Sequence, residues 1–262
     1  MSQSVDVVIV GSGNVAEAFA RAVSGAQGLS LRQIFARNRE RGEQLASEFN
    51  TTWSNEPGAL ERADIYVIAV SDRAVESVAQ SLPFARGSMV VHTAGSVPLS
   101  VLPVHSTRRG IVYAFQSFTQ GRRVEFRGLT IFVEAESDDD YTLLESFAKM
   151  LESRVVRADS ERRRVIHLAG VFVNNFVNHL YASAADILSG VDLDFETLKP
   201  LIDETARKAL ECNDPRKVQT GPAVRGDRAV TERHLEMLRD DETKQQIYKY
   251  ITESIWETSK KI

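Results

Sequence analysis

The sequence predicts an α/β protein, in which a doubly wound, mostly parallel sheet is followed by an all-α C-terminal domain. Short apolar runs alternate with amphipathic helical patterns in the first part of the chain, as in parallel strands joined by right-handed crossovers. A glycine-rich turn joins the first apolar run directly to the first helical pattern. From Asp159 onward only helical patterns remain. We therefore expect two domains, residues 1–158 and 159–262.

The glycine turn predicts a dinucleotide-binding site of the Rossmann type. Residues 7–10 are all β-branched, which is typical of a buried strand, and they lead into Gly-x-Gly-x-x-Ala at residues 11–16. Gly11 permits the tight turn, Gly13 lets a pyrophosphate approach the backbone, and a small Ala16 lets the helix pack on the strand. The alternative is a structural turn in a cofactor-free domain. The residues expected to bind the cofactor here are Gly11, Ser12, Gly13, Asn14 and Val15.

The end of the second strand, predicted at residues 31–36, indicates which dinucleotide binds. An NAD-preferring site places Asp or Glu about 20 residues after the glycines, where it binds the ribose 2′-hydroxyl. This chain has Arg37, Asn38 and Arg39 there instead. Arginine suits a 2′-phosphate, because its guanidinium is permanently charged and forked. We therefore expect these three residues to bind the cofactor and the cofactor to be NADP. In the alternative interpretation the two arginines are solvated residues at a helix start.

The remaining strands of this half supply further candidates. After a charged helix at 39–49, strands are predicted at 51–53, 64–70, 89–92, 111–115, 129–134 and 154–156, with helical segments at 57–62, 73–82 and 138–152. Ligands in such sheets bind at the carboxyl ends of the strands. We therefore assign Ser71 and Thr93 to the cofactor, and Ser96 and Gln116 to the substrate. Each of them could instead finish a strand or cap a helix.

A long helix predicted at 162–189 is apolar nearly all round, so we expect it inside a core or between subunits. It nevertheless carries a polar stripe, in which His167, Asn174 and Asn178 fall within about 40° of one another at 100° per residue. We interpret His167 as the catalytic acid, Asn174 or Asn175 as a catalytic amide that orients the reacting group, and Asn178 as a substrate contact. The alternative is a set of hydrogen bonds across a helix–helix contact, as in a dimer.

Three more helices are predicted at 195–210, 227–238 and 243–256. A loop at 219–227 separates the first two. Its Gly226 and Asp227 are explained by a turn and a helix N-cap. Arg225 is not explained in this way, so we assign it to binding of an anionic substrate or the cofactor phosphate.

Composition excludes several classes of protein. The net charge of −4 gives no overall attraction to nucleic acid or to anionic membranes. No apolar run approaches the ~20 residues of a membrane span, and we expect neither nucleic-acid nor membrane partners. One cysteine and a first strand at about residue 5 lead us to expect a cytoplasmic location. The five histidines lack metal-ligand spacing, so we expect no metal.

The whole chain resembles a bacterial family in which a Rossmann-like half precedes a helical domain of the DUF2520 type. The matching stretches are residues 10–16, 92–96, 115–118, 167–169, 174–179 and 220–227. The resemblance implies an NADP- or F420-dependent oxidoreductase, in a wider group with pyrroline-5-carboxylate reductases and β-hydroxyacid dehydrogenases. The latter carry a lysine one turn before an asparagine of the long helix, where this chain has Gly170 or Val171. Their lysine-based acid catalysis therefore does not transfer.

We therefore expect an NADP-dependent oxidoreductase that transfers a hydride between nicotinamide and a small carbonyl or imine compound. Two other hypotheses remain open: a non-catalytic NADP(H)-binding sensor, and an F420-dependent NADP reductase. The apolar surface of the predicted helices leads us to expect a homodimer formed through the helical domain.

Overall fold

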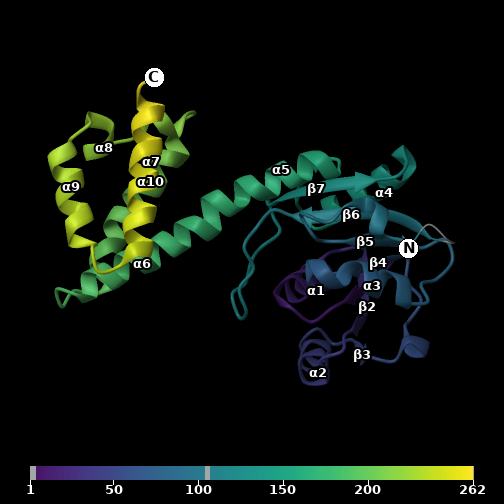
Figure 1. Cartoon of the computed structure of the whole chain (residues 1–262). Coiled ribbons are helices and arrows are strands. Elements are labelled where there is room, and N and C mark those ends of the chain that lie inside the picture. The colour runs from purple at the N-terminus through teal and green to yellow at the C-terminus, as the bar shows by residue number, and fades with distance from the viewer. Residues whose placement is uncertain (1–3, 104–106, 262) are drawn as a thin grey trace. The chain divides into compact units, whose positions relative to one another are not determined.

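The computed structural model describes residues 4–103 and 107–261, and within them one sheet of eight strands forms the N-terminal part (Figure 1). The strand order is β3-β2-β1-β4-β5-β6-β7-β8. The strands are β1 (Val5–Val10), β2 (Leu29–Phe35), β3 (Thr52–Ser54), β4 (Ile65–Ile68), β5 (Met89–His92), β6 (Arg108–Ala114), β7 (Thr130–Ala135) and β8 (Arg154–Arg157).

The sheet is mostly parallel, as predicted. Every neighbouring pair is parallel except β6 and β7, which run antiparallel. The segment between β6 and β7 contains no helix in the described residues, whereas a parallel pairing needs a crossover connection that is usually helical. The strand order reverses between β1 and β4, and ligands bind at such a reversal, outside the carboxyl ends of the strands.

Two apolar layers cover the two faces of the sheet and make it doubly wound. Val7 and Ile9 of β1 belong to a layer with helices α1, α2 and α4, whereas Val8 and Val10 belong to a layer with α3. This alternation follows from the two-residue period of a strand. The helices are α1 (Asn14–Gly25), α2 (Arg39–Glu48), α3 (Val75–Ser81) and α4 (Asp138–Met150). The short 3₁₀ helices of this part are η1 (Pro57–Ala59), η2 (Asp72–Ala74) and η3 (Leu99–Val101).

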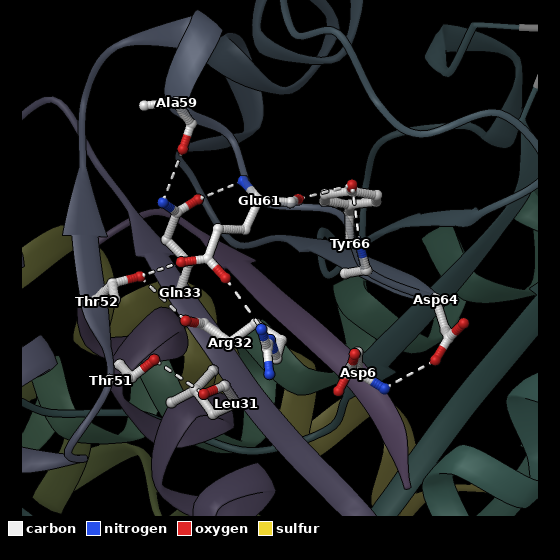
Figure 2. A network of polar contacts seen from close by, with 11 residues as sticks. Asp6, Leu31, Arg32, Gln33, Thr51, Thr52, Ala59, Glu61, Asp64 and Tyr66 are labelled. Atoms are coloured by element: carbon white, nitrogen blue, oxygen red, sulfur yellow. Dashed lines mark hydrogen bonds and ion pairs between the residues drawn. The ribbon is translucent and has the colours of Figure 1, made fainter. Parts of the chain in front are cut away.

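A polar network holds the connection between β3 and β4 (Figure 2). The Gln33 side chain, which is almost fully buried in β2, donates to the Ala59 carbonyl at 2.9 Å and accepts from the Glu61 backbone N–H at 3.0 Å. The Tyr66 hydroxyl donates to the Glu61 carbonyl at 2.8 Å, and Thr52 donates to the Glu61 carboxylate at 2.8 Å. These bonds satisfy backbone groups that strand pairing leaves free, and they fix a segment whose Pro57 lines the cavity described below.

The C-terminal part is helical from Ser160 onward in the described residues. Its elements are α5 (Ser160–Gly170), the π-helix η4 (Val171–Phe176), α6 (Val177–Ser189), η5 (Phe195–Leu198), α7 (Lys199–Glu211), η6 (Pro215–Val218), α8 (Pro222–Arg225), α9 (Arg228–Met237) and α10 (Glu242–Ser259). The described helices include none with the length and apolarity needed to cross a lipid bilayer.

The predicted single helix at 162–189 is therefore wrong in one respect, because a π-helical turn interrupts it. The i→i+5 hydrogen bonds of that turn are wider than α-helical ones, so the spacing of 100° per residue does not hold across it. Asn174 and Asn175 lie on the π-helical turn itself, which changes their direction relative to His167. Such turns are frequent at functional sites.

The chain divides into two compact units, the first ending at Asn175 and the second beginning at Phe176. The change from strands to helices lies between β8 and α5, near the predicted boundary at residue 158, but α5 packs with the sheet. The guanidinium of Arg163, which is fully buried, forms an ion pair with Glu134 of β7 and donates to the Val97 carbonyl. The Ser160 hydroxyl donates to the same carboxylate at 2.9 Å. These contacts anchor the start of α5 on the first unit.

Candidate active site

The carboxyl ends of β1, β2 and β4 border a cavity of about 1060 Å³, here named the glycine-turn cavity. It lies in the first compact unit, at the place that the sheet topology predicts. Eight of the predicted cofactor-binding residues line it: Gly11, Ser12, Gly13, Asn14, Val15, Arg37, Asn38 and Ser71. Two predicted residues, Arg39 and Thr93, are not among its lining residues.

The two glycines of the turn have different tasks. Gly11 has a φ of +133°, and a Cβ there would lie 2.3 Å from the Ala69 carbonyl oxygen, so the fold itself requires glycine. A Cβ on Gly13 would meet no protein atom within 4 Å. Gly13 is also the N-cap of α1 and provides no side-chain cap, so the helix N-terminus faces open space with free N–H groups. This arrangement fits a phosphate group.

The far end of the cavity, at the carboxyl end of β2, is basic. Arg37 is exposed and lines the cavity, and the Asn38 side chain caps α2 by accepting from the Arg41 backbone N–H at 3.0 Å. The Arg39 guanidinium instead forms an ion pair with Glu43 at 2.9 Å and lies 5.9 Å from the centre of the Trp53 ring. Arg37 is therefore the predicted arginine that the structure brings to the cavity.

After β5, the predicted polar residues Thr93 and Ser96 form hydrogen bonds within the chain. The Thr93 side chain is buried, and its hydroxyl donates to the Ile68 carbonyl at 3.5 Å. The Ser96 hydroxyl donates to the carboxylate of Asp72, which lines the glycine-turn cavity beside Ser71. Ser96 thus contacts the lining of the cavity without lining it itself, through Asp72, a residue that the sequence did not single out.

A second cavity of about 460 Å³ lies in the same compact unit and is here named the tyrosine–histidine cavity. Its lining comes from the end of β6, from α5 and from the π-helix η4: Tyr113, Phe115, Gln116, Ser117, His167, Gly170, Val171, Val173, Asn174 and Asn175. Consecutive residues border the two cavities, since Ser117 lines this one and the next residue, Phe118, lines the glycine-turn cavity. The Asn14 side chain binds the Phe118 carbonyl at 3.0 Å and joins this segment to the glycine turn.

A tyrosine–histidine pair forms one wall of the second cavity. The Tyr113 hydroxyl and Nδ1 of His167 are 3.2 Å apart, and both side chains are half-buried. A Cβ on Gly95 would lie 2.8 Å from His167 Nδ1 and 2.8 Å from Tyr113 Cζ, so only glycine leaves room for this pair. Burial raises the pKa of the Tyr113 phenol, and the charge of Asp72 adds to this, whereas Arg163 acts in the opposite direction. Tyr113 therefore keeps its proton at neutral pH.

The polar stripe predicted on the long helix is divided between the two compact units. His167, Asn174 and Asn175, the three predicted catalytic residues, meet in the tyrosine–histidine cavity together with Gln116. Asn178 lies on α6 and Arg225 at the end of α8, both exposed and both in the second unit. Their assignment to the substrate remains a prediction.

In the tyrosine–histidine cavity, the sequence analysis missed Tyr113. A signal was present, since Tyr113 and Phe115 alternate with the buried Val112 and Ala114 and so occupy the other face of β6. Helix α5 packs against that face, where His167 contacts Tyr113. The rule for strand ends points only to the residues after the strand, and Tyr113 lies within it.

Burial determines the protonation state of one further titratable group beside the site. His92, at the end of β5, is fully buried and accepts a hydrogen bond from the Ala94 backbone N–H at 3.2 Å. Burial, reinforced by the charge of Arg163, lowers the pKa of His92 to about 4. His92 is therefore neutral at pH 7. The described residues contain no group of three or more His, Cys, Asp or Glu side chains that could hold a metal ion.

Family models match both halves of the chain. Residues 6–95 match the model described as NADP oxidoreductase, coenzyme F420-dependent, and residues 129–255 match the domain of unknown function DUF2520. A solved structure from Bacteroides fragilis, described as a "putative NADP oxidoreductase", is 36% identical, with a TM-score of 0.88 over 98% of this chain and 100% of that one. The chain belongs to the DUF2520 family. No curated protein sequence matches it.

More distant structures share the fold of this DUF2520 protein. A reductive aminase from Aspergillus terreus, solved with NADPH and ethyl-5-oxohexanoate, has a TM-score of 0.73 and 12% identity over 96% of this chain and 93% of that one. A 1-pyrroline-5-carboxylate reductase from Streptococcus pyogenes has a TM-score of 0.65 and 11% identity over 99% of both chains. These structures show the shared fold, and the family model over residues 6–95 together with the 36% identical structure identifies an NADP oxidoreductase family with an NAD(P)-binding type of domain.

Proposed function

We propose that the chain is an NADP-dependent oxidoreductase that transfers a hydride between nicotinamide and a small carbonyl or imine compound. The observation that carries the proposal is the open N-terminus of α1, where a Cβ on Gly13 would meet no protein atom. Packing within the protein does not require glycine at this position, whereas an approaching pyrophosphate does. The tyrosine–histidine cavity supplies a place for the substrate.

In this proposal the residues of the chain bind and orient, and NADP(H) supplies the hydride chemistry. The backbone around Gly13 holds the pyrophosphate, and Arg37 binds the 2′-phosphate through its forked guanidinium. His167 serves as the proton source, and the amide of Asn174 or Asn175 orients the reacting group. The second cavity combines the aromatic rings of Tyr113 and Phe115 with the polar side chains of His167, Asn174 and Asn175, so it offers both apolar contact and hydrogen bonds to a substrate.

Nucleotide titration tests the first part of the proposal. Trp53 reports on the cavity, because its indole N–H donates at 3.1 Å to the carbonyl of Ala36, which lines it. We expect NADPH to quench Trp53 fluorescence with a Kd at least tenfold below that of NADH. Arg37→Ala should remove most of this preference, since a charge-assisted hydrogen bond contributes about 1.5–3 kcal/mol. Arg39→Ala is the matched control and should retain it. Failure of both nucleotides to bind contradicts the proposal.

A turnover screen tests the second part. Ketones, aldehydes and cyclic imines are offered with NADPH, and oxidation is followed by absorbance. His167→Ala should lower the rate about 10²-fold or more, the usual contribution of a positioned acid. An unchanged rate would show that His167 is not the acid. Nucleotide binding without turnover of any compound would favour the sensor, and oxidation by F420 alone would favour the F420-dependent reductase that the N-terminal family model describes.

We also propose that the helical unit forms a homodimer. Between residues 176 and 261, all within the described part of the chain, no residue is buried. Large apolar side chains are exposed instead, with Leu210 at 85%, Met237 at 77% and Leu201 at 65% of their accessible area. A helical domain of this kind requires a partner to bury its apolar surface, and a second copy is the commonest partner. Light scattering should give twice the chain mass; a monomer at micromolar concentration would refute this.

A further inference from the structure

We infer that the tyrosine–histidine cavity takes an uncharged carbonyl compound, whose oxygen is bound and protonated by the hydroxyl of Tyr113. The inference rests on the proposed oxidoreductase function and specifies its substrate class. It also makes Tyr113, rather than His167 alone, the residue that contacts the substrate oxygen.

The first observation is the position of the Tyr113 hydroxyl. The ring is held by Phe132, stacked at a centroid distance of 6.3 Å, and by Phe115, edge-on at 6.1 Å. The hydroxyl therefore has a fixed place on the cavity wall, 3.2 Å from His167 Nδ1. A phenol can bind a carbonyl oxygen and a second partner at once, because it both donates and accepts.

The second observation concerns charge. Apart from the imidazole of His167, the residues lining this cavity in the described part of the chain carry no ionisable acid or base other than the Tyr113 phenol. The charged groups that act on Tyr113 from neighbouring elements are Asp72 and Arg163, and neither lines the cavity. Asp72 accepts from Ser96, and Arg163 is paired with Glu134. A carboxylate substrate would lose its hydration here without gaining a cation, and such a loss is costly.

The third observation is that consecutive residues border the two cavities: Gln116 and Ser117 line the tyrosine–histidine cavity, and the next residue, Phe118, lines the glycine-turn cavity. A carbonyl compound in the second cavity therefore lies beside the site proposed for the nucleotide. In the reduction, the carbonyl carbon gains a hydride from reduced nicotinamide, and the π electron pair of the C=O bond moves to oxygen. That oxygen takes the Tyr113 proton as the phenolic O–H bond breaks. The tyrosinate then regains a proton from the Nδ1–H of neutral His167 while Nε2 of the same ring takes a proton from solvent, so the imidazole changes tautomer and stays uncharged.

An isosteric pair of probes tests the charge argument. Isobutyramide and isobutyrate have the same shape, NADPH reduces neither, and they differ by one negative charge. Binding to the full-length protein is measured at pH 8 by ligand-observed NMR, with and without NADPH. We expect isobutyramide to bind and isobutyrate to bind at least tenfold more weakly. Equal or tighter binding of isobutyrate, or no binding of isobutyramide, overturns the inference.

A matched pair of variants tests the role of the hydroxyl. Tyr113→Phe keeps the ring and its aromatic contacts, and should weaken isobutyramide binding about tenfold, the upper range for one lost hydrogen bond. Tyr248→Phe is the control, because it removes the hydroxyl from another tyrosine–histidine pair, in which Tyr248 and His234 Nδ1 are 2.8 Å apart in the second unit. The control should bind like wild type. Wild-type affinity in Tyr113→Phe overturns the inference.

Failure of the proposed function gives a different result. If neither NADPH nor NADH binds, the oxidoreductase proposal falls, whatever the probes show. If NADPH binds and keto acids are reduced in preference to neutral ketones of equal size, the oxidoreductase proposal stands and the present inference falls. If neutral ketones are reduced and Tyr113→Phe lowers kcat at unchanged NADPH affinity, both stand.

Discussion

Gly13→Ala should separate folding from nucleotide binding. The backbone of Gly13 has φ −79° and ψ −176°, which alanine adopts freely, and the added methyl group meets no protein atom within 4 Å. Losing an N-cap glycine costs at most about 1 kcal/mol, and the reduced freedom of the unfolded chain returns about 0.4–1 kcal/mol. The free energy of unfolding should therefore change by less than about 1 kcal/mol.

Nucleotide affinity should respond far more strongly. The methyl group occupies the space in front of the α1 N-terminus, so a pyrophosphate there loses its close approach to the backbone N–H groups. One lost hydrogen bond to a charged group corresponds to about 1.5–3 kcal/mol, or a 10- to 100-fold increase in the Kd for NADPH.

Gly11→Ala, two residues earlier, provides the contrast. Its Cβ would lie 2.3 Å from the Ala69 carbonyl oxygen, at a φ of +133° that alanine avoids. This variant should lose at least about 2 kcal/mol of stability. Urea unfolding and Trp53 titration measure both quantities for both variants. A folded Gly13→Ala protein that binds NADPH like wild type would refute the placement of the nucleotide at this turn.

Three further predictions concern the groups around the site. The pKa of His92 is lowered to about 4 in the folded chain, so between pH 6.5 and about 4 the unfolded chain binds a proton that the folded chain does not. The contribution of neutral His92 to stability is therefore complete above pH 6.5 and declines as the pH falls to about 4. Its size is about 3 kcal/mol, and urea unfolding of His92→Gln should show a correspondingly flatter pH profile; an identical profile would contradict the assignment. Glu134→Gln leaves the guanidinium of Arg163 buried without its counter-charge and should lower the free energy of unfolding by about 3–5 kcal/mol. Glu152→Gln breaks the exposed ion pair with Arg127 and should cost less than about 1 kcal/mol. Equal losses would argue against the Arg163–Glu134 pair as the anchor of α5. Gly95→Ala should push the rings of Tyr113 and His167 apart and lower the free energy of unfolding by about 1–3 kcal/mol. The affinity for NADPH should be unchanged. Loss of NADPH binding in this variant would show that the nucleotide site depends on the tyrosine–histidine pair.

Local patterns in the sequence predict the α/β half well, because its elements are short, strongly periodic and punctuated. The run at 7–10, the glycine turn and the helix that follows each indicate the same βα unit, and β5 has the predicted bounds of 89–92. The eight cofactor residues that reach the glycine-turn cavity follow from the topological rule for strand ends. This part needs no knowledge of distant contacts.

Features that depend on distant contacts were not predictable in the same way. The π-helical turn at Val171–Phe176 leaves no signature in an apolar periodic pattern, so the sequence predicts the stripe of His167, Asn174 and Asn178 on a regular helix. The pairing of Tyr113 with His167 joins residues 54 positions apart and depends on how α5 crosses β6. The engagement of Thr93 with Ile68 is a backbone contact that residue type alone does not reveal.

The segment Gln116–Ser117–Phe118 forms a shared wall, with Ser117 facing one chamber and Phe118 the other, and the Asn14 amide fastens it to the glycine turn. A ligand that displaces this stretch from one side would therefore change the fit of a ligand on the other side. Thermodynamic linkage makes that influence mutual: whatever factor a nucleotide contributes to the affinity of a small molecule, the small molecule returns to the nucleotide.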